Sequence, residues 1–343
     1  MIRSLTSLRF LFILFIFLHH SRGYVGGGSM GVAFFFVLGG FCMALGYKEK
    51  VLKKDFDFKH YLKRRLIKFY PLHWLCLFAV ILLSFLTSKP VTGEGNLMAF
   101  VANFALLHSW VPIKDFYFSF NSVSWYLANT VFFTVAFPSI FKWILEANNR
   151  GKILIVTLFA VLYLMMSILI PSTFWHPILY ISPIIRIIDF VFGIFLALFY
   201  FAIKDSVRTE RFFKNGNINF VIIFGLIALL ILESIVLGDF QLIAPVYWPI
   251  IAIIILWTAL SNQSRGLYTI LENKYLVRLG ESSFTFFMIH TIVLKFAKVN
   301  IHGAVAFYFV LTLLLTLLID RFIIPPITKW LTKRILPSMT ARS

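Results

Sequence analysis

The chain has 343 residues, of which 60% are hydrophobic and 13% charged, against roughly 45–50% and about 25% in an average soluble domain. This composition excludes a soluble globular protein, which would lack polar surface, and a disordered chain, which needs low hydrophobicity. The net charge of +18 does not indicate nucleic-acid binding, because the basic residues lie in loops between apolar segments. We therefore predict an all-α, polytopic membrane protein.

The apolar segments are long enough to define the spans, since a helix needs about 20 mainly apolar residues to cross the hydrocarbon core. Ten helices are predicted in chain order, at roughly residues 5–21, 30–47, 71–88, 122–144, 153–171, 184–203, 217–237, 243–260, 282–299 and 304–324. A shorter apolar stretch, residues 97–110, is expected to form an interfacial or re-entrant helix.

The distribution of basic residues predicts the orientation. Of the 32 Lys and Arg residues, 25 fall on one side of the predicted spans, three on the other and four within spans. Basic loops stay cytoplasmic, so both termini are expected to face the cytoplasm. We see no internal repeat and no soluble extension, and residues 1–343 are predicted to form a single membrane domain.

Two ionisable residues, Arg9 and His20, lie in the first span. They are eleven residues apart, about three helical turns, so they share a face with an axial separation of ~16 Å. His19 would point some 80–100° away, and this geometry selects His20. The alternative is that Arg9 snorkels to the headgroups while His20 lies in the outer interface. The glycine-rich residues 26–31 are expected to form an external turn.

A second basic cluster, Arg64, Arg65 and Lys68, precedes the third span, with Pro71 expected in its first turn. Arg64 and Lys68 share a helix face at the i, i+4 spacing, and three fixed cations could hold a polyphosphate. Membrane orientation alone would also place basic residues here.

Other polar groups in the spans are expected to pack or pair rather than to catalyse. Arg186 and Asp189, three residues apart, could form an intrahelical ion pair. His108 is expected in an interfacial belt, and Cys42 and Cys76 are interpreted as buried small hydrophobes without metal-ligand spacing. Packing or pairing is also expected for Asn121, Ser122, Ser124 and His290.

An ordered series of motifs runs from Leu8 to about Leu294. It comprises Leu8-Arg9 with His20, Gly31-Val32 with residues 35–41, residues 64–71, Ser124-Trp125 through Pro138, Pro183 with Arg186, Asp189-Phe190 and Gly193, and Leu279-Gly280 with Ser283 and His290. In these motifs and in their order along the chain, the sequence resembles the bacterial membrane acyltransferase type 3 family. These are integral-membrane O-acyltransferases that modify cell-surface glycans.

The chain departs from the family pattern at four places. Lys68 stands where the family's basic element has a third Arg, which keeps the charge but loses bidentate geometry. Gly39 replaces a usual Ser, and Asp189 is shorter than the usual Glu. Asn129 and Thr130 occupy the fourth-span region where many members carry acidic residues.

The resemblance implies an O-acyltransferase of the bacterial cytoplasmic (inner) membrane. Its co-substrate would be a cytoplasmic acyl-CoA, expected to be acetyl-CoA, with no metal, and its acceptor a hydroxyl of a cell-surface or lipid-linked glycan. A neutral imidazole suits proton abstraction near pH 7, so His20 would be the general base. Arg9 would steady the thioester or the phosphates, and Arg64, Arg65 and Lys68 would hold the coenzyme A phosphates.

Two other interpretations remain open on the sequence. A transporter or flippase for a glycan or small anion could use the same charges to line a route, although no repeat symmetry supports it. An accessory subunit that has lost catalysis is supported only by the absent fourth-span acid. The sequence identifies neither the acceptor nor the acyl chain length, the oligomeric state or a covalent acyl-histidine step.

Overall fold

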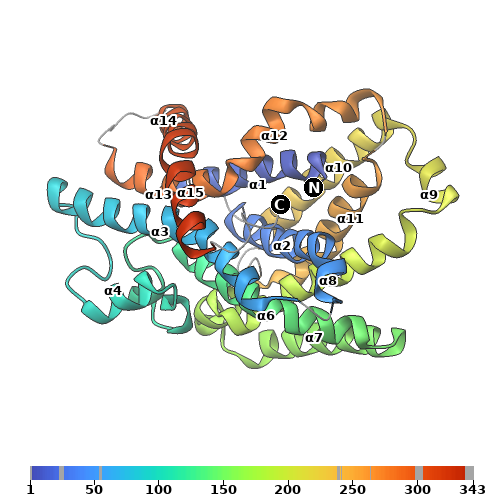
Figure 1. The fold of residues 1–343 in the computed structure, drawn as a ribbon, viewed down its shortest axis with the longest axis horizontal. Helices are drawn as coiled ribbons and strands as arrows, with labels where there is room; N and C mark the ends of the chain where they lie inside the picture. The colour runs from blue at the N-terminus through green and yellow to red at the C-terminus, as the bar shows by residue number, and fades with distance from the viewer. Residues whose placement is uncertain are drawn as a thin grey trace. The chain divides into compact units, whose positions relative to one another are not determined.

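The computed structural model describes residues 2–22, 27–53, 56–237, 240, 242–262, 264–297 and 304–336. Within these ranges the chain is helical, with turns and no β-strand (Figure 1). Eight described helices are long and apolar enough to cross a membrane, and two apolar helices are shorter. These ten segments coincide with the ten predicted spans, so the all-α, polytopic architecture is confirmed.

The helices that coincide with the predicted spans differ from them mainly at their ends. They are α1 (Arg3–Arg22), α2 (Gly27–Val51), α3 (Phe58–Thr87), α6 (Ser124–Glu146), α7 (Asn149–Leu169), α8 (Pro183–Ile203), α10 (Gly216–Val236), η5 (Ala244–Tyr247) with α11 (Trp248–Leu260), α13 (Ser283–Phe296), and α14 (Val305–Leu318) with η7 (Ile319–Ile323) and α15 (Ile324–Ile335).

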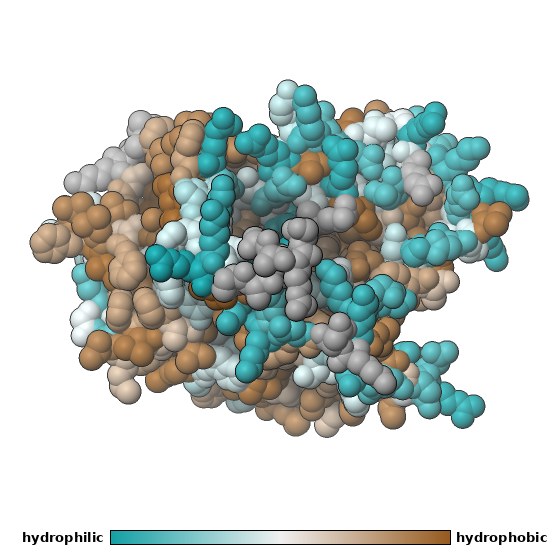
Figure 2. Space-filling model, in the orientation of Figure 1, coloured by the Kyte–Doolittle hydropathy of each residue, from teal (hydrophilic) through white to brown (hydrophobic). Residues whose placement is uncertain are grey.

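Shorter helices connect these spans. They are α4 (Leu97–Phe104), η1 (His108–Trp110), α5 (Lys114–Tyr117), η2 (Ser172–Phe174), η3 (Trp175–Ile181), α9 (Val207–Phe212), η6 (Gly266–Glu272) and α12 (Lys274–Glu281). Apolar residues, brown in Figure 2, cover much of the face in view, with hydrophilic residues gathered in teal clusters. An apolar exterior of this kind suits lipid rather than water.

The chain divides into two compact units. Unit 1 comprises Met1–Val51, Phe141–Tyr180 and Ile184–Ser283, and unit 2 comprises Leu52–Ile140, Ile181–Pro183 and Phe284–Ser343. Each unit contains segments that are distant in sequence, so neither forms from one continuous stretch of chain.

In unit 1, α1 packs against α2 through glycines of α2. A Cβ atom added at Gly28 would lie 2.8 Å from Cδ2 of His19, and one at Gly31 would lie 2.6 Å from Cγ1 of Ile16. The prediction of an external turn over residues 26–31 is therefore wrong for residues 27–31, which are helical. These glycines permit close approach of two helices, the usual role of small residues in membrane bundles.

The contact between α2 and α8 is closer still. A Cβ atom at Gly40 would lie 1.8 Å from the backbone oxygen of Phe190, and one at Gly193 would lie 1.9 Å from that of Val37. Each helix therefore presents a glycine to the backbone of the other. No larger residue fits at either position without moving a helix, so this contact sets the separation of α2 and α8.

Unit 2 is built around α3, a 30-residue helix. Asp57 caps it by accepting a hydrogen bond from the backbone N–H of His60 at 2.9 Å. Because this cap starts the helix at Phe58, Pro71 lies inside the helix, and the prediction of a first-turn proline is wrong. The basic cluster is therefore helical and continuous with the span.

The apolar stretch of residues 97–110, predicted as an interfacial or re-entrant helix, forms the short helices α4 and η1 rather than a full span. Leu97 and Met98 are 74% and 75% exposed, whereas Ala99 and Asn103 on the other side of α4 are fully buried. The helix thus presents one apolar face outward, which suits the membrane surface.

The glycine contact predicts a sharp difference between two adjacent positions. The Gly40→Ala variant should lose stability by about 1–3 kcal/mol or more, because its methyl group overlaps the backbone of α8. Gly39→Ala is the matched control, since its nearest neighbour, the Phe190 ring, is 3.8 Å away. Thermal unfolding of both purified variants in detergent measures the difference; equal melting temperatures would contradict the contact.

Candidate functional site

The two residues predicted for catalysis, Arg9 and His20, both lie on the continuous helix α1 of unit 1. Arg9 is half-buried and His20 is exposed, while Phe12, Ile13 and Ile16 between them are buried. The helix thus carries a cation in its first half and an accessible imidazole near its end.

The two adjacent histidines of α1 occupy different surroundings. The ring of His19 packs against Gly28 of α2, as the 2.8 Å approach to a Cβ at that position shows. His20 is the more exposed of the two. The packing of His19 against α2 accounts for its position, whereas His20 is exposed and its ring lies edge-to-face with that of His19. The role of His20 as a base stays a prediction.

The three cations predicted for nucleotide binding lie together on α3 in unit 2. Arg64 and Lys68 are exposed at i, i+4 spacing, and Arg65 is half-buried with its guanidinium carbon 5.9 Å from the centre of the Tyr61 ring. The Tyr61 hydroxyl donates to the backbone oxygen of Thr134 at 2.9 Å, which ties this part of α3 to α6. The helix therefore presents two of the three cations to the surroundings.

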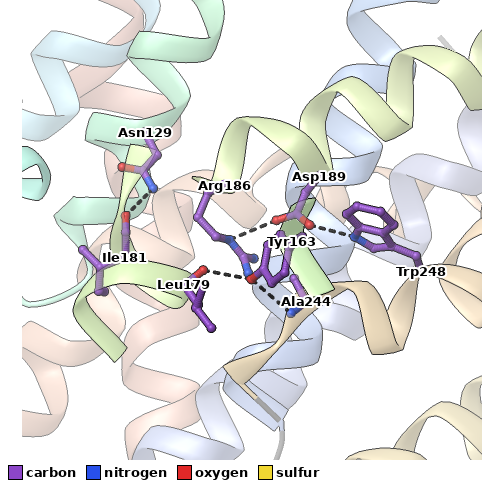
Figure 3. Close-up of polar contacts among 8 residues, drawn as sticks. All are labelled: Asn129, Tyr163, Leu179, Ile181, Arg186, Asp189, Ala244 and Trp248. Atoms are coloured by element: carbon purple, nitrogen blue, oxygen red, sulfur yellow. Dashed lines mark hydrogen bonds and ion pairs between the residues drawn. The ribbon is translucent and has the colours of Figure 1, made fainter. Parts of the chain in front are cut away.

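The intrahelical ion pair predicted for Arg186 and Asp189 is confirmed, and it is fully buried in unit 1. Nε of Arg186 lies 3.0 Å from Oδ2 of Asp189, with the two side chains 1% and 0% exposed. The indole N–H of Trp248 donates to Oδ1 of Asp189 at 2.7 Å (Figure 3). The contribution of Trp248 was not predicted, because its partner lies 59 residues away.

Aromatic rings surround the guanidinium of Arg186. Its carbon lies 5.0 Å from the centre of the Phe36 ring and 5.5 Å from that of Tyr180. The guanidinium also donates to the hydroxyl of Tyr163, which itself donates to the backbone oxygen of Leu179 at 3.0 Å. Such rings stabilise a cation that has left water.

In unit 2, polar side chains join the connection between α3 and α6 to the spans. Ser124 at the start of α6 contacts Nε2 of His108 at 3.0 Å and donates to the backbone oxygen of Asn121 at 2.7 Å. Asn121 in turn donates to the backbone oxygen of Met288 at 2.8 Å. These contacts fit the pairing role expected for Asn121 and Ser124.

His108 was expected in an interfacial belt, and this expectation is wrong because the side chain is fully buried. Burial, together with the charge of the neighbouring His73, lowers the pKa of His108 to about 3. The ring therefore stays neutral at physiological pH and serves as a hydrogen-bonding group.

The described residues contain no group of three or more His, Cys, Asp or Glu side chains that could hold a metal ion. Neither Cys42 nor Cys76 forms a disulfide in the described residues; Cys42 is half-buried and Cys76 is buried.

The family description "Acyltransferase domain" matches residues 2–321, nearly the whole chain. The chain belongs to the acyltransferase type 3 family. A relative, "Acyltransferase MdmB" of Streptomyces mycarofaciens, is 26% identical over 287 residues, which cover 78% of this chain and 69% of the relative. No solved structure matches the chain.

Asn129 is one of the two fourth-span residues at which the sequence was expected to depart from the family pattern. The Asn129 side chain is buried, and its amide nitrogen donates to the backbone oxygen of Ile181 at 2.8 Å (Figure 3). A carboxylate there would set a buried negative charge against a carbonyl oxygen. The amide nitrogen is therefore satisfied, whereas the amide oxygen Oδ1 is buried without a hydrogen-bond partner in the described residues.

The buried ion pair predicts a large effect of a single truncation. Asp189→Ala should cost about 3–5 kcal/mol of stability, because it leaves the Arg186 guanidinium uncompensated inside the bundle. The matched control is Glu146→Ala, whose partner Lys142 is 3.9 Å away in an exposed pair. Thermal unfolding in detergent should show a clear drop for the first variant and none for the second; equal losses would refute the difference.

Proposed function

We propose that this acyltransferase moves an acetyl or other short acyl group from cytoplasmic acyl-CoA to a hydroxyl of a cell-surface or lipid-linked glycan. The observation that carries the proposal is the family match over residues 2–321, in a chain with membrane-spanning helices. The site of action is the bacterial cytoplasmic membrane, where acyl-CoA is supplied on one face and the acceptor on the other.

His20 is proposed as the general base. Its neutral imidazole takes the proton of the acceptor hydroxyl as the oxygen attacks the thioester carbonyl carbon. The carbon–sulfur bond then breaks, and coenzyme A leaves as a thiolate that takes up a proton. The exposure of His20, compared with the packed ring of His19, supports this choice.

The cations are proposed to hold the donor. Arg64, Arg65 and Lys68 bind the phosphates of coenzyme A, since guanidinium and ammonium groups form charge-assisted hydrogen bonds with phosphate. The exposure of Arg64 and Lys68 supports this assignment. Arg9, half-buried on the helix that carries His20, steadies the thioester or the phosphates.

The base is tested with purified protein in detergent, radiolabelled acetyl-CoA and the His20→Ala and His19→Ala variants. Thioester loss should fall by roughly 10²–10⁴-fold in His20→Ala, because the hydroxyl or a water loses its proton acceptor. His19→Ala should keep the wild-type rate while losing some packing against Gly28. Full turnover in a folded His20→Ala sample would overturn the assignment, and equal losses in both variants would indicate that the wrong histidine was chosen.

The donor site is tested by the Arg64→Gln, Lys68→Gln double variant, which changes only exposed side chains. The KM for acetyl-CoA should rise roughly tenfold or more with little change in kcat, because charge-assisted bonds to phosphate are lost. Lys59→Gln is the matched control, an exposed cation on the same helix outside the cluster. An unchanged KM in the double variant would remove these residues from the donor site.

A further inference from the structure

Two lysines, Lys89 and Lys295, meet at one end of unit 2. The ammonium of Lys89, which follows α3, donates to the backbone oxygen of Lys295 at 3.1 Å. In return, the ammonium of Lys295, in the last turn of α13, donates to the backbone oxygen of Pro90 at 2.9 Å. Because each lysine bonds to the segment that carries the other, both positive charges lie at the same junction. An ammonium has three N–H donors, and each lysine uses one of them in this contact.

The lysine pair lies at the end of the spans where basic residues are scarce. Only three of the 32 Lys and Arg residues fall in the loops of the predicted outer side, and Lys89 is one of the three. Outer loops of membrane proteins carry few cations, and two like charges placed together repel each other. The position of this pair therefore calls for an anion that would compensate it.

One carboxylate, that of Glu94, belongs to the same turn of the chain. Its Oε2 accepts a hydrogen bond from the Ser84 hydroxyl at 2.8 Å and one from the backbone N–H of Val91 at 3.0 Å. No ion pair joins Glu94 to either lysine in the described residues. Glu94 thus closes the turn and balances one of the two positive charges, so that one positive charge remains at the junction.

An apolar cluster fixes the junction in place. Phe296, the residue after Lys295, and Val91, two residues after Lys89, are buried in one cluster with Leu77 of α3. The two ammonium groups are therefore attached to backbone that is held by buried side chains and by the reciprocal hydrogen bonds. Groups fixed in this way lose little conformational entropy when they bind a ligand.

The part of α3 that leads to this junction has a strongly apolar surface. Leu82, Phe85 and Leu86 are 56%, 81% and 65% exposed, and their spacing places them on one face of the helix. Lys89 follows Leu86 by three residues. An exposed apolar face that leads to fixed cations is matched to an amphiphile, with its hydrocarbon chain on the helix and its anionic group at the lysines.

We propose that Lys89 and Lys295 bind the phosphate group of a lipid-linked acceptor. This inference rests on the proposed function, and it selects a lipid-linked glycan over a free polysaccharide as the acceptor. Ammonium groups form charge-assisted hydrogen bonds with phosphate oxygens. The hydrocarbon chain of the carrier lipid lies along the apolar face of α3, so its phosphate is held at the membrane boundary and the glycan extends from there.

The test measures the binding of farnesyl diphosphate, a probe with a hydrocarbon chain and phosphates, to purified protein in detergent by titration calorimetry. The Lys89→Gln, Lys295→Gln double variant should bind the probe roughly tenfold or more weakly than the wild type. Lys114→Gln is the matched control, an exposed lysine of the predicted outer side, and should keep the wild-type Kd. The Arg64→Gln, Lys68→Gln variant should also keep it, which separates this site from the donor cations.

Further variants separate binding from folding, because a cation at the C-terminal turn of a helix also stabilises that helix. The Lys89→Arg, Lys295→Arg variant keeps the charges and donors and should keep the affinity. If the double Gln variant has a lowered melting temperature, the single Lys295→Gln variant is measured instead, since it changes an exposed side chain. It should weaken binding on its own. Farnesol and inorganic diphosphate, which each lack one half of the probe, should bind more weakly than farnesyl diphosphate.

The outcomes distinguish this site from the proposed function. A folded lysine variant that binds farnesyl diphosphate as tightly as the wild type overturns the site and leaves the proposed function standing. Inorganic diphosphate that binds equally tightly overturns the lipid carrier, and so does equal competition by phosphatidylglycerol vesicles, which would indicate a site for any phospholipid headgroup. A wild-type protein that binds the probe but does not cleave acetyl-CoA overturns the proposed function and the acceptor role, while the lipid-phosphate site stands.

Discussion

A hydrogen-bonding group inside a bilayer cannot bind water, so it must find its partner within the protein. This constraint decides where the polar residues of the chain lie. Asp189 receives a guanidinium and an indole N–H, and Asn129 donates to a backbone oxygen. Asn121 donates to Met288 and accepts from Thr291. Other buried polar atoms of the described residues, among them Nη2 of Arg186, Oδ1 of Asn129 and the Tyr247 hydroxyl, have no such partner.

Close helix packing supplies the rigidity on which the polar groups of unit 1 depend. Gly40 and Gly193 bring α2 and α8 into backbone contact, which sets Phe36 of α2 beneath the guanidinium of Arg186. At the other face of α2, Gly28 and Gly31 admit the side chains of α1. One helix with small residues on two faces thus positions both the imidazole-bearing helix and the buried ion pair.

The spans could be predicted because their length and apolar character are properties of single segments. The ion pair of α8 could be predicted for the same reason, since Arg186 and Asp189 are three residues apart on one helix. Errors arose where the outcome depended on a neighbouring element. Residues 27–31 were expected to turn, but they serve a helix contact that only the position of α1 makes visible.

The same reason accounts for the other differences between prediction and structure. Pro71 was expected to start a helix, but the upstream cap at Asp57 starts it earlier. His108 was placed at an interface, whereas Ser124 and His73 surround it in the fold. Trp248 gave no signal at all, because its hydrogen bond to Asp189 joins two residues that are 59 positions apart in sequence. Its importance is a property of the tertiary fold.

The ion pair of α8 also bears on how the protein enters the membrane during synthesis. A lone charge within a span is costly to insert, and Arg186 and Asp189 lie in the first two turns of α8. Arg186 and Asp189 are three residues apart on one helix, so their contact needs no second helix and can form as soon as α8 coils. The segment can therefore pass from the translocation machinery into lipid with its charges already compensated, before Trp248 has been synthesised to complete the site.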